Sequence, residues 1–161
     1  MSGTLVLGIG NRLGGDDAAG NLLVDALARK QQTAGDPSPG HIVAIDGGVA
    51  PETYTRVIRR HRPDLLILVD AADMGLAPGS LRVITPQAVT VLSFSTHNMP
   101  LSMLMSYVKQ FCGAVVLVGV QPEQTQIGSQ TSKAVDTGIS ELADVILEGR
   151  VADIPLLDKA S

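Results

Sequence analysis

The sequence predicts a layered α/β domain built on a largely parallel sheet. Apolar runs of strand length, such as 65–69 and 114–118, alternate along the chain with segments whose apolar residues recur at helical spacing. The chain has 161 residues and is 45% hydrophobic, which is enough for one domain with its own buried core. Because no apolar run reaches the roughly 18 residues that a membrane span needs, we assign this hydrophobicity to a buried sheet.

The first half of the chain predicts three strands and two helices. Residues 4–9 (TLVLGI) are a buried strand that ends in a glycine turn. A helix follows at about 16–31, with acidic residues at its start and basic residues at its end, as the helix dipole favours. Residues 42–45 are a second strand, and a proline opens the helix expected at 51–61. The continuous apolar run 65–69 is typical of a parallel strand covered on both faces.

The second half continues this alternation. Residues 81–84 are expected to form a short fourth strand, and an amphipathic helix is expected over 101–112. Residues 114–120 are the fifth strand, and a last helix is expected around 135–146. We therefore expect a single domain over residues 1–150 and a frayed tail over residues 151–161, where the sequence shows no clear period.

Composition excludes several classes of protein. The net charge of −4 and the 2% aromatic content argue against a nucleic-acid-binding module. A single cysteine, Cys112, excludes a disulfide framework and any metal site built from cysteines; we expect it to pack in the core. The first residues carry no basic segment and run directly into a strand, so we expect no signal peptide and a cytoplasmic protein. A monomer is the default for this size.

Polar side chains follow the predicted strands where ligands bind in open α/β sheets, outside the carboxyl ends. These residues are Asn11, Asp16, Asp17, Asp46, Asp70, Gln121 and Glu123, with His97 in a loop just before a helix. Two carboxylates and one imidazole suit a divalent cation such as zinc or nickel, with positions left for water or substrate. The same three groups can act as acid and base around a water molecule.

Each of these side chains also has a purely structural interpretation. Asp17 alone fits a charge at a helix N-terminus, and Asp46 precedes two glycines, as turn-forming aspartates do. Asp70 ends an apolar strand, where a buried carboxylate needs a partner, and a satisfied turn former is the alternative there. His97 stands directly before a helix, where loop and capping residues are common.

The glycine turn leaves a nucleotide-binding enzyme as another alternative. Residues 8–11 follow a strand and precede a helix, as a dinucleotide-binding fingerprint does, but the third glycine position holds Leu13. Asp16 and Asp17 stand where the helix N-terminus would meet a pyrophosphate, and two carboxylates would repel it. The residues themselves thus favour this alternative less than a carboxylate site.

Several motifs occur in an order that identifies a family. Residues 8–17 (GIGNRLGGDD), 69–75 (VDAADMG) and 96–101 (THNMPL) resemble three motifs of the nickel–iron hydrogenase maturation endopeptidases. The third motif resembles the branch that processes the hydrogenase-3-type large subunit. Asp46-Gly47-Gly48 with Ala50-Pro51-Glu52, and residues 119–123 (GVQPE), match as well. One departure is Ala18, where the family often has glycine.

This resemblance implies both a fold and an activity. The fold is a three-layer sandwich with a twisted, mostly parallel five-stranded sheet and helices on both faces. The activity is removal of a short C-terminal extension from the hydrogenase large-subunit precursor after nickel insertion, with cleavage after a basic residue. A non-catalytic chaperone that checks the precursor for nickel is the alternative in another class.

The resemblance also assigns the site. The family's three metal-binding positions fall on Asp17, Asp70 and His97, and the second acidic residue of the first motif is the one that matches. Asp46 matches a further acidic position of the cleft, and we expect Asp46 and Asn11 to contribute to the substrate cleft. Our hypothesis is that Asp17, Asp70 and His97 are catalytic and engage nickel that arrives within the precursor. The resting site is then empty or holds another divalent cation.

Overall fold

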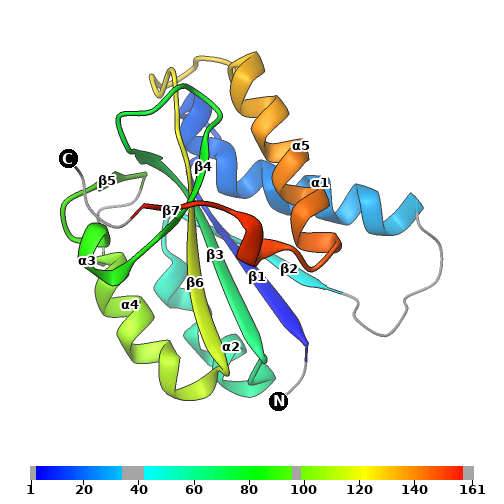
Figure 1. Ribbon diagram of the computed structural model, residues 1–161. Coiled ribbons are helices and arrows are strands. Elements are labelled where there is room, and N and C mark those ends of the chain that lie inside the picture. The colour runs from blue at the N-terminus through cyan, green and yellow to red at the C-terminus, as the bar shows by residue number, and fades with distance from the viewer. Residues whose placement is uncertain (1–2, 34–41, 96–98, 158–161) are drawn as a thin grey trace.

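The computed structural model describes residues 3–33, 42–95 and 99–157, and it confirms the predicted α/β fold class. Helices cover both faces of one mixed sheet (Figure 1). The strands are β1 (Thr4–Ile9), β2 (Val43–Gly48), β3 (Leu65–Asp73), β4 (Leu81–Ile84), β5 (Ser93–Phe94), β6 (Ala114–Val120) and β7 (Leu156–Leu157). The α-helices are α1 (Ala19–Thr33), α2 (Thr55–His61), α3 (Pro86–Val89), α4 (Leu101–Val108) and α5 (Lys133–Leu147).

The sheet order is β2-β1-β3-β6-β4-β7, and β5 pairs with the end of β3 outside this path. β1 is parallel to β2 and β3, and β3 is parallel to β6. β4 is antiparallel to β6, so the sheet is mixed at one side. The parallel strands therefore end at the same edge, which is the edge away from the N-terminus in Figure 1.

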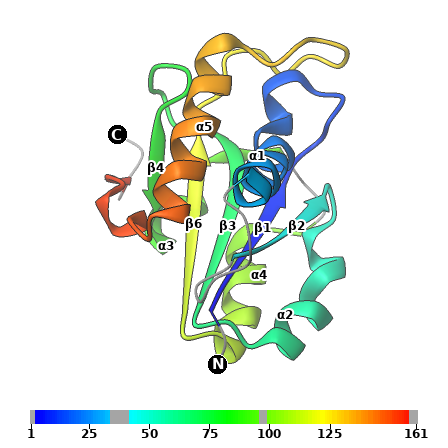
Figure 2. The same ribbon diagram turned by 90° about the vertical axis from the view of Figure 1, so that its right-hand side faces the viewer.

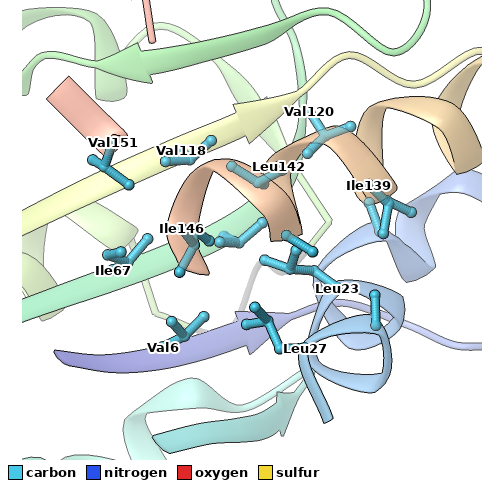
Figure 3. Packing of buried hydrophobic residues seen from close by; sticks show 14 of the residues in the cluster. Val6, Leu23, Leu27, Ile67, Val118, Val120, Ile139, Leu142, Ile146 and Val151 are labelled. Atoms are coloured by element: carbon cyan, nitrogen blue, oxygen red, sulfur yellow. The ribbon is translucent and has the colours of Figure 1, made fainter. Parts of the chain in front are cut away.

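Two hydrophobic layers sandwich the sheet, because alternate residues of each strand point to opposite faces. Val6 of β1 packs with Leu23 of α1 and Leu142 of α5 on one face, as Figure 3 shows. Leu5 and Leu7 pack on the other face with Ile58 of α2 and with α4. Figure 2 shows α1 and α5 on one side of the strands and α4 on the other.

The short elements are where the structure differs from the sequence prediction. The described residues form a sheet of seven strands rather than five, because the two-residue strands β5 and β7 were not expected. The four-residue helix α3 was not expected either. Segments this short carry no hydrophobic period, so tertiary contacts decide their structure. The five expected strands and the expected helices are all present, with ends that shift by a few residues.

The prediction of a frayed tail is wrong for residues 151–157. Val151–Asp153 form a 3₁₀ helix, and β7 runs parallel to β4. Val151 and Ile154 are buried and join the core under α5. The physical reason is that β4 would otherwise be an open edge of the sheet. The segment around β7 supplies acceptors for the amides of β4, since Pro155 O, directly before β7, accepts from Val83 N at 2.9 Å. Residues 158–161 lie outside the described part.

No helix among the described residues is long and apolar enough to cross a lipid bilayer.

Candidate active site

An acidic cleft of about 390 Å³ opens at the carboxyl ends of β3 and β6. Its lining residues are Asp17, Ala71, Asp73, Ser93, Phe94, Gln121, Pro122, Glu123 and Thr125. Another hollow, of about 340 Å³, lies near the start of β1 and under Leu156, but its lining contains no titratable side chain. We therefore place the chemistry in the acidic cleft, at the edge where open α/β sheets bind ligands.

Asp70 lies fully buried in β3, one residue before Ala71 of the cleft wall. Ser95 Oγ donates a hydrogen bond to Asp70 Oδ1. Asp70 Oδ2 is also buried, and no described residue donates a hydrogen bond to it. A buried carboxylate oxygen without a donor is costly in a folded protein. Asp70 is therefore not the satisfied turn former of the structural alternative.

The electrostatics of Asp70 point in the same direction. Burial raises the pKa of the Asp70 carboxyl well above its usual range, and the negative charge of Asp17 raises this pKa further. Hydrogen bonds from Ser95 and from the backbone of Ala71 act in the opposite direction without cancelling the rise. Like-charged carboxylates that interact in this way favour a cation between them.

Asp17 belongs to a 3₁₀ helix, Gly15–Ala18, which precedes α1. Its backbone is fixed on both sides: Asp17 N donates to Gly14 O, and Asp17 O accepts from Asn11 N, each at 3.0 Å. The side chain is half-buried and lines the cleft. The charge of Asp17 thus acts on the carboxyl of Asp70, so the two predicted carboxylates interact electrostatically.

The neighbouring Asp16 has a different environment, since it is buried and satisfied. Asp16 Oδ2 accepts from Glu123 N at 2.8 Å and from Gln124 N at 3.0 Å. Asp16 Oδ1 accepts from Ser132 N at 2.7 Å, and the Ser132 hydroxyl donates to Oδ2 at 2.9 Å. Asp16 therefore ties the loop after β1 to the loop after β6, and we call this set of bonds the Asp16 clamp.

Asp46 and Asn11 do not line the cleft; hydrogen bonds within the protein hold both. Asp46 Oδ2 accepts from Arg12 Nη2 at 2.7 Å, and Oδ1 accepts from Asn21 Nδ2 at 2.7 Å and Gly48 N at 2.9 Å. Burial raises the Asp46 pKa, but these hydrogen bonds outweigh it and the pKa is lowered. Asn11 Oδ1 accepts from Leu13 N at 2.9 Å, which makes it a turn former.

The geometry also disfavours nucleotide binding. A phosphate at the loop after β1 would need free backbone amides. The amides of Gly14 and Asp17 donate within this loop, to Asn11 O and Gly14 O, and the amide of Asp16 donates to Gln124 O at 2.7 Å. These three donors are therefore already used by the protein.

His97, the third predicted ligand, lies outside the described residues. Within residues 3–33, 42–95 and 99–157, no three His, Cys, Asp or Glu side chains gather closely enough to hold a metal ion. The complete set of Asp17, Asp70 and His97 therefore stays a prediction. The described residues include the two carboxylates. They also include β5, where Phe94 and Ser93 pair with Ala72 and Asp73 of β3. β5 ends three positions before His97 in the sequence.

Comparisons with known proteins agree with this architecture. The family model for HycI, described as hydrogenase maturation protease, matches residues 22–149. The hydrogenase 3 maturation protease of Escherichia coli K12 is 42% identical over 120 residues, which cover 74% of this chain and 72% of that protein. The chain belongs to the HycI family of hydrogenase maturation proteases.

Solved structures of the HycI family share the whole fold. The solution structure of the endopeptidase HycI from Escherichia coli superposes with a TM-score of 0.82 at 33% identity, covering 98% of this chain and 97% of that one. The crystal structure of HycI from Thermococcus kodakarensis KOD1 has a TM-score of 0.78 at 31% identity, covering 92% of each chain. This chain is accordingly a protease.

Two contacts at the candidate site of this HycI-family protease were missed from the sequence. Ser95, which donates to Asp70, gave no signal apart from its place next to the Thr96-His97 motif. Gln121 was expected only as a strand-end group, but it is buried and braces the cleft wall. Its Oε1 accepts from Met74 N at 2.6 Å, and its Nε2 donates to Asp73 Oδ1 at 3.2 Å. Glutamine can do both because its amide has a donor and an acceptor end.

Cys112 is buried, as predicted, and packs in the core beside α4. Burial raises the pKa of its thiol, and the thiolate is the reactive form of cysteine. Burial and the raised pKa both argue against this thiol as the nucleophile.

Proposed function

We propose that this protease removes the C-terminal extension of the nickel–iron hydrogenase large-subunit precursor after nickel insertion, and that Asp17, Asp70 and His97 engage that nickel. The observation that carries the proposal is Asp70 Oδ2, a buried carboxylate oxygen that no described residue satisfies, beside the charge of Asp17. The identity of 42% to the hydrogenase 3 maturation protease of Escherichia coli supports the substrate class.

The side chains of Asp17, Asp70 and His97 suit the nickel that the precursor carries. Two carboxylates and one imidazole suit a borderline divalent cation such as nickel, and three protein ligands leave positions for groups of the substrate. Nickel is then part of the substrate rather than a resident ion. A cation between Asp17 and Asp70 would offset the repulsion that contributes to the raised pKa of Asp70.

The sequence supports the inclusion of His97. It lies two positions after Ser95, within the segment that resembles the family's third motif. Ser95 donates a hydrogen bond to Asp70 and directly follows β5, which pairs with β3. The proposal therefore includes His97 as the third ligand.

Peptide-bond hydrolysis requires side chains that can accept and release a proton. The oxygen of water bonds to the scissile carbonyl carbon, the C–N bond breaks, and a proton passes to the leaving amine. Asp17, Asp70 and His97 are the groups of the site that can hold that proton. A cation beside the scissile carbonyl polarises it, and the same cation marks the precursor as loaded.

Mass spectrometry of a purified large-subunit precursor tests the proposal. The precursor is incubated with the protease, with and without nickel loaded. We expect loss of the C-terminal mass only from the loaded sample, no loss with Asp70→Asn, and full loss with the control Asp136→Asn, which changes an exposed carboxylate of α5. Equal loss from both samples would remove the nickel requirement. An intact loaded precursor that stays bound to the protein would contradict cleavage and favour the chaperone alternative.

A further inference from the structure

The two most exposed large apolar side chains of the described residues lie on neighbouring loops. Leu13, in the loop after β1, is 68% exposed, and Ile127, in the loop after β6, is 73% exposed. Single exposed apolar side chains are ordinary on protein surfaces. Two of them on loops that touch are a different observation, because exposed apolar side chains that gather on a surface mark interaction sites. We call this pair the rim ledge.

Backbone contacts hold the rim ledge together. Gly128 N, directly after Ile127, donates to Leu13 O at 2.8 Å. Gly15 has φ +58°, and a β-carbon there would clash with Ser129 Oγ and Gln124 O, so the two loops touch at a glycine. The Asp16 clamp adds the bonds from Glu123 N and Gln124 N. The exposure of Leu13 and Ile127 is therefore a property of a braced surface.

The rim ledge lies on the two segments that also supply lining residues of the acidic cleft. Leu13 is four residues before Asp17, and the loop that carries Ile127 also carries Glu123 and Thr125 of the cleft lining. Figures 1 and 2 both show the loops after β1 and β6 at the same end of the molecule. The rim ledge is therefore at the same end of the molecule as the cleft.

We propose that Leu13 and Ile127 dock an apolar surface of the folded precursor, next to the segment that enters the cleft. This inference rests on the proposed function. The occupant follows from position, since a protease cleft must receive its substrate and the loops of the rim ledge also line that cleft. A second copy of this chain is the other occupant, and the test below separates the two. Burial of exposed aliphatic side chains in such a contact favours binding and leaves the chemical step unchanged.

The double variant Leu13→Ser with Ile127→Ser tests the rim ledge. We expect KM for the nickel-loaded precursor to rise about tenfold or more, with kcat within about twofold of wild type. The melting temperature should stay unchanged, because both side chains are already exposed. The matched control is Leu156→Ser, since Leu156 is 67% exposed and borders the hollow at the other end of the sheet. We expect wild-type KM for this control.

A binding assay separates this inference from the proposed function. Retention of loaded precursor on the immobilised Asp70→Asn protease, with and without the two serines, reports docking without cleavage. Weaker retention with the serines supports the rim ledge even if the wild-type protein leaves the precursor uncut, which would instead defeat the proposed function. Equal retention and an unchanged KM would overturn the rim ledge. Loss of a dimer of this chain in light scattering, with processing unchanged, would assign the ledge to a second copy and also overturn it.

Discussion

Asp46 of β2 and Asp70 of β3 lie toward the carboxyl ends of two parallel strands on either side of β1, yet their surroundings are opposite. Asp46 is partly exposed and receives hydrogen bonds from Arg12, Asn21 and Gly48. Asp70 is fully buried, receives a side-chain bond only at Oδ1 among the described residues, and faces the charge of Asp17. The pKa of Asp46 is lowered and that of Asp70 is raised. Position at a strand end thus does not decide the role of a carboxylate; the donors around it do.

This contrast distinguishes carboxylates that stabilise the fold from the carboxylate that we propose acts in the reaction. A carboxylate with a full set of donors stabilises the fold as an anion. A buried carboxylate with an unsatisfied oxygen costs stability, and proteins keep such groups where function requires them. The same reasoning places Asp16, which has four hydrogen bonds to its carboxylate, with Asp46.

The largest expected effect is on the activity of Asp70→Asn. Processing of loaded precursor should fall about 10³-fold, or about 4 kcal/mol of transition-state stabilisation. At neutral pH the melting temperature should rise by a few degrees, because the variant removes a buried carboxylate beside Asp17. Calorimetry and quantitative mass spectrometry measure both on one sample. Retained processing would contradict a catalytic role of Asp70. A lower melting temperature would contradict the conclusion that its buried carboxylate costs stability.

The next effect is on the stability of Asp16→Ala. It leaves the amides of Glu123, Gln124 and Ser132 without their acceptor, which we expect to cost about 3 kcal/mol. The melting temperature should fall by about 10 °C. Asp16→Asn keeps one oxygen acceptor and should lose less. An unchanged melting temperature in Asp16→Ala would show that the Asp16 clamp does not hold the two loops together.

Ser95→Ala tests whether the hydroxyl positions Asp70. Without this donor the Asp70 carboxylate can rotate, so we expect kcat to fall about tenfold with little change in KM. Ser95→Thr keeps the hydroxyl and should restore most of kcat. A fall in kcat that threonine does not restore would indicate only a packing role for Ser95.

The smallest effect is an acid dependence of stability at Asp46. Its folded pKa is below the unfolded value of about 4, so its contribution is present above pH 4 and is lost as the pH falls through the folded pKa. The contribution should be under about 1 kcal/mol, since the Arg12 pair is partly exposed. Thermal unfolding of wild type and Asp46→Asn from pH 6 to pH 2.5 should converge at low pH. A constant difference would contradict this.

The sequence predicted the long elements and the edge that carries the site, because both depend on local patterns. β3 begins with the continuous apolar run 65–69, which Asp70 follows directly, and β6 is apolar throughout apart from Gly119. Local patterns could not separate Asp16 from Asp17; only the family resemblance singled out Asp17. They are adjacent carboxylates, and the difference comes from Ser132 and Gln124, more than 100 positions away. Ser95 was missed for the same reason, since its partner is 25 residues distant.

The pairing of β7 with β4 has a consequence for solubility. Without residues 151–157, the amides of Val83 and Thr85 would lose their acceptors, Pro155 O and Leu157 O, and an apolar strand edge would be exposed. Such edges template aggregation between copies of a protein. The last described strand, only two residues long and preceded by a proline, is itself a poor template. These few residues therefore act as a guard against edge-to-edge association, and shortening the chain before them would yield protein that precipitates at concentrations where the full chain stays dispersed.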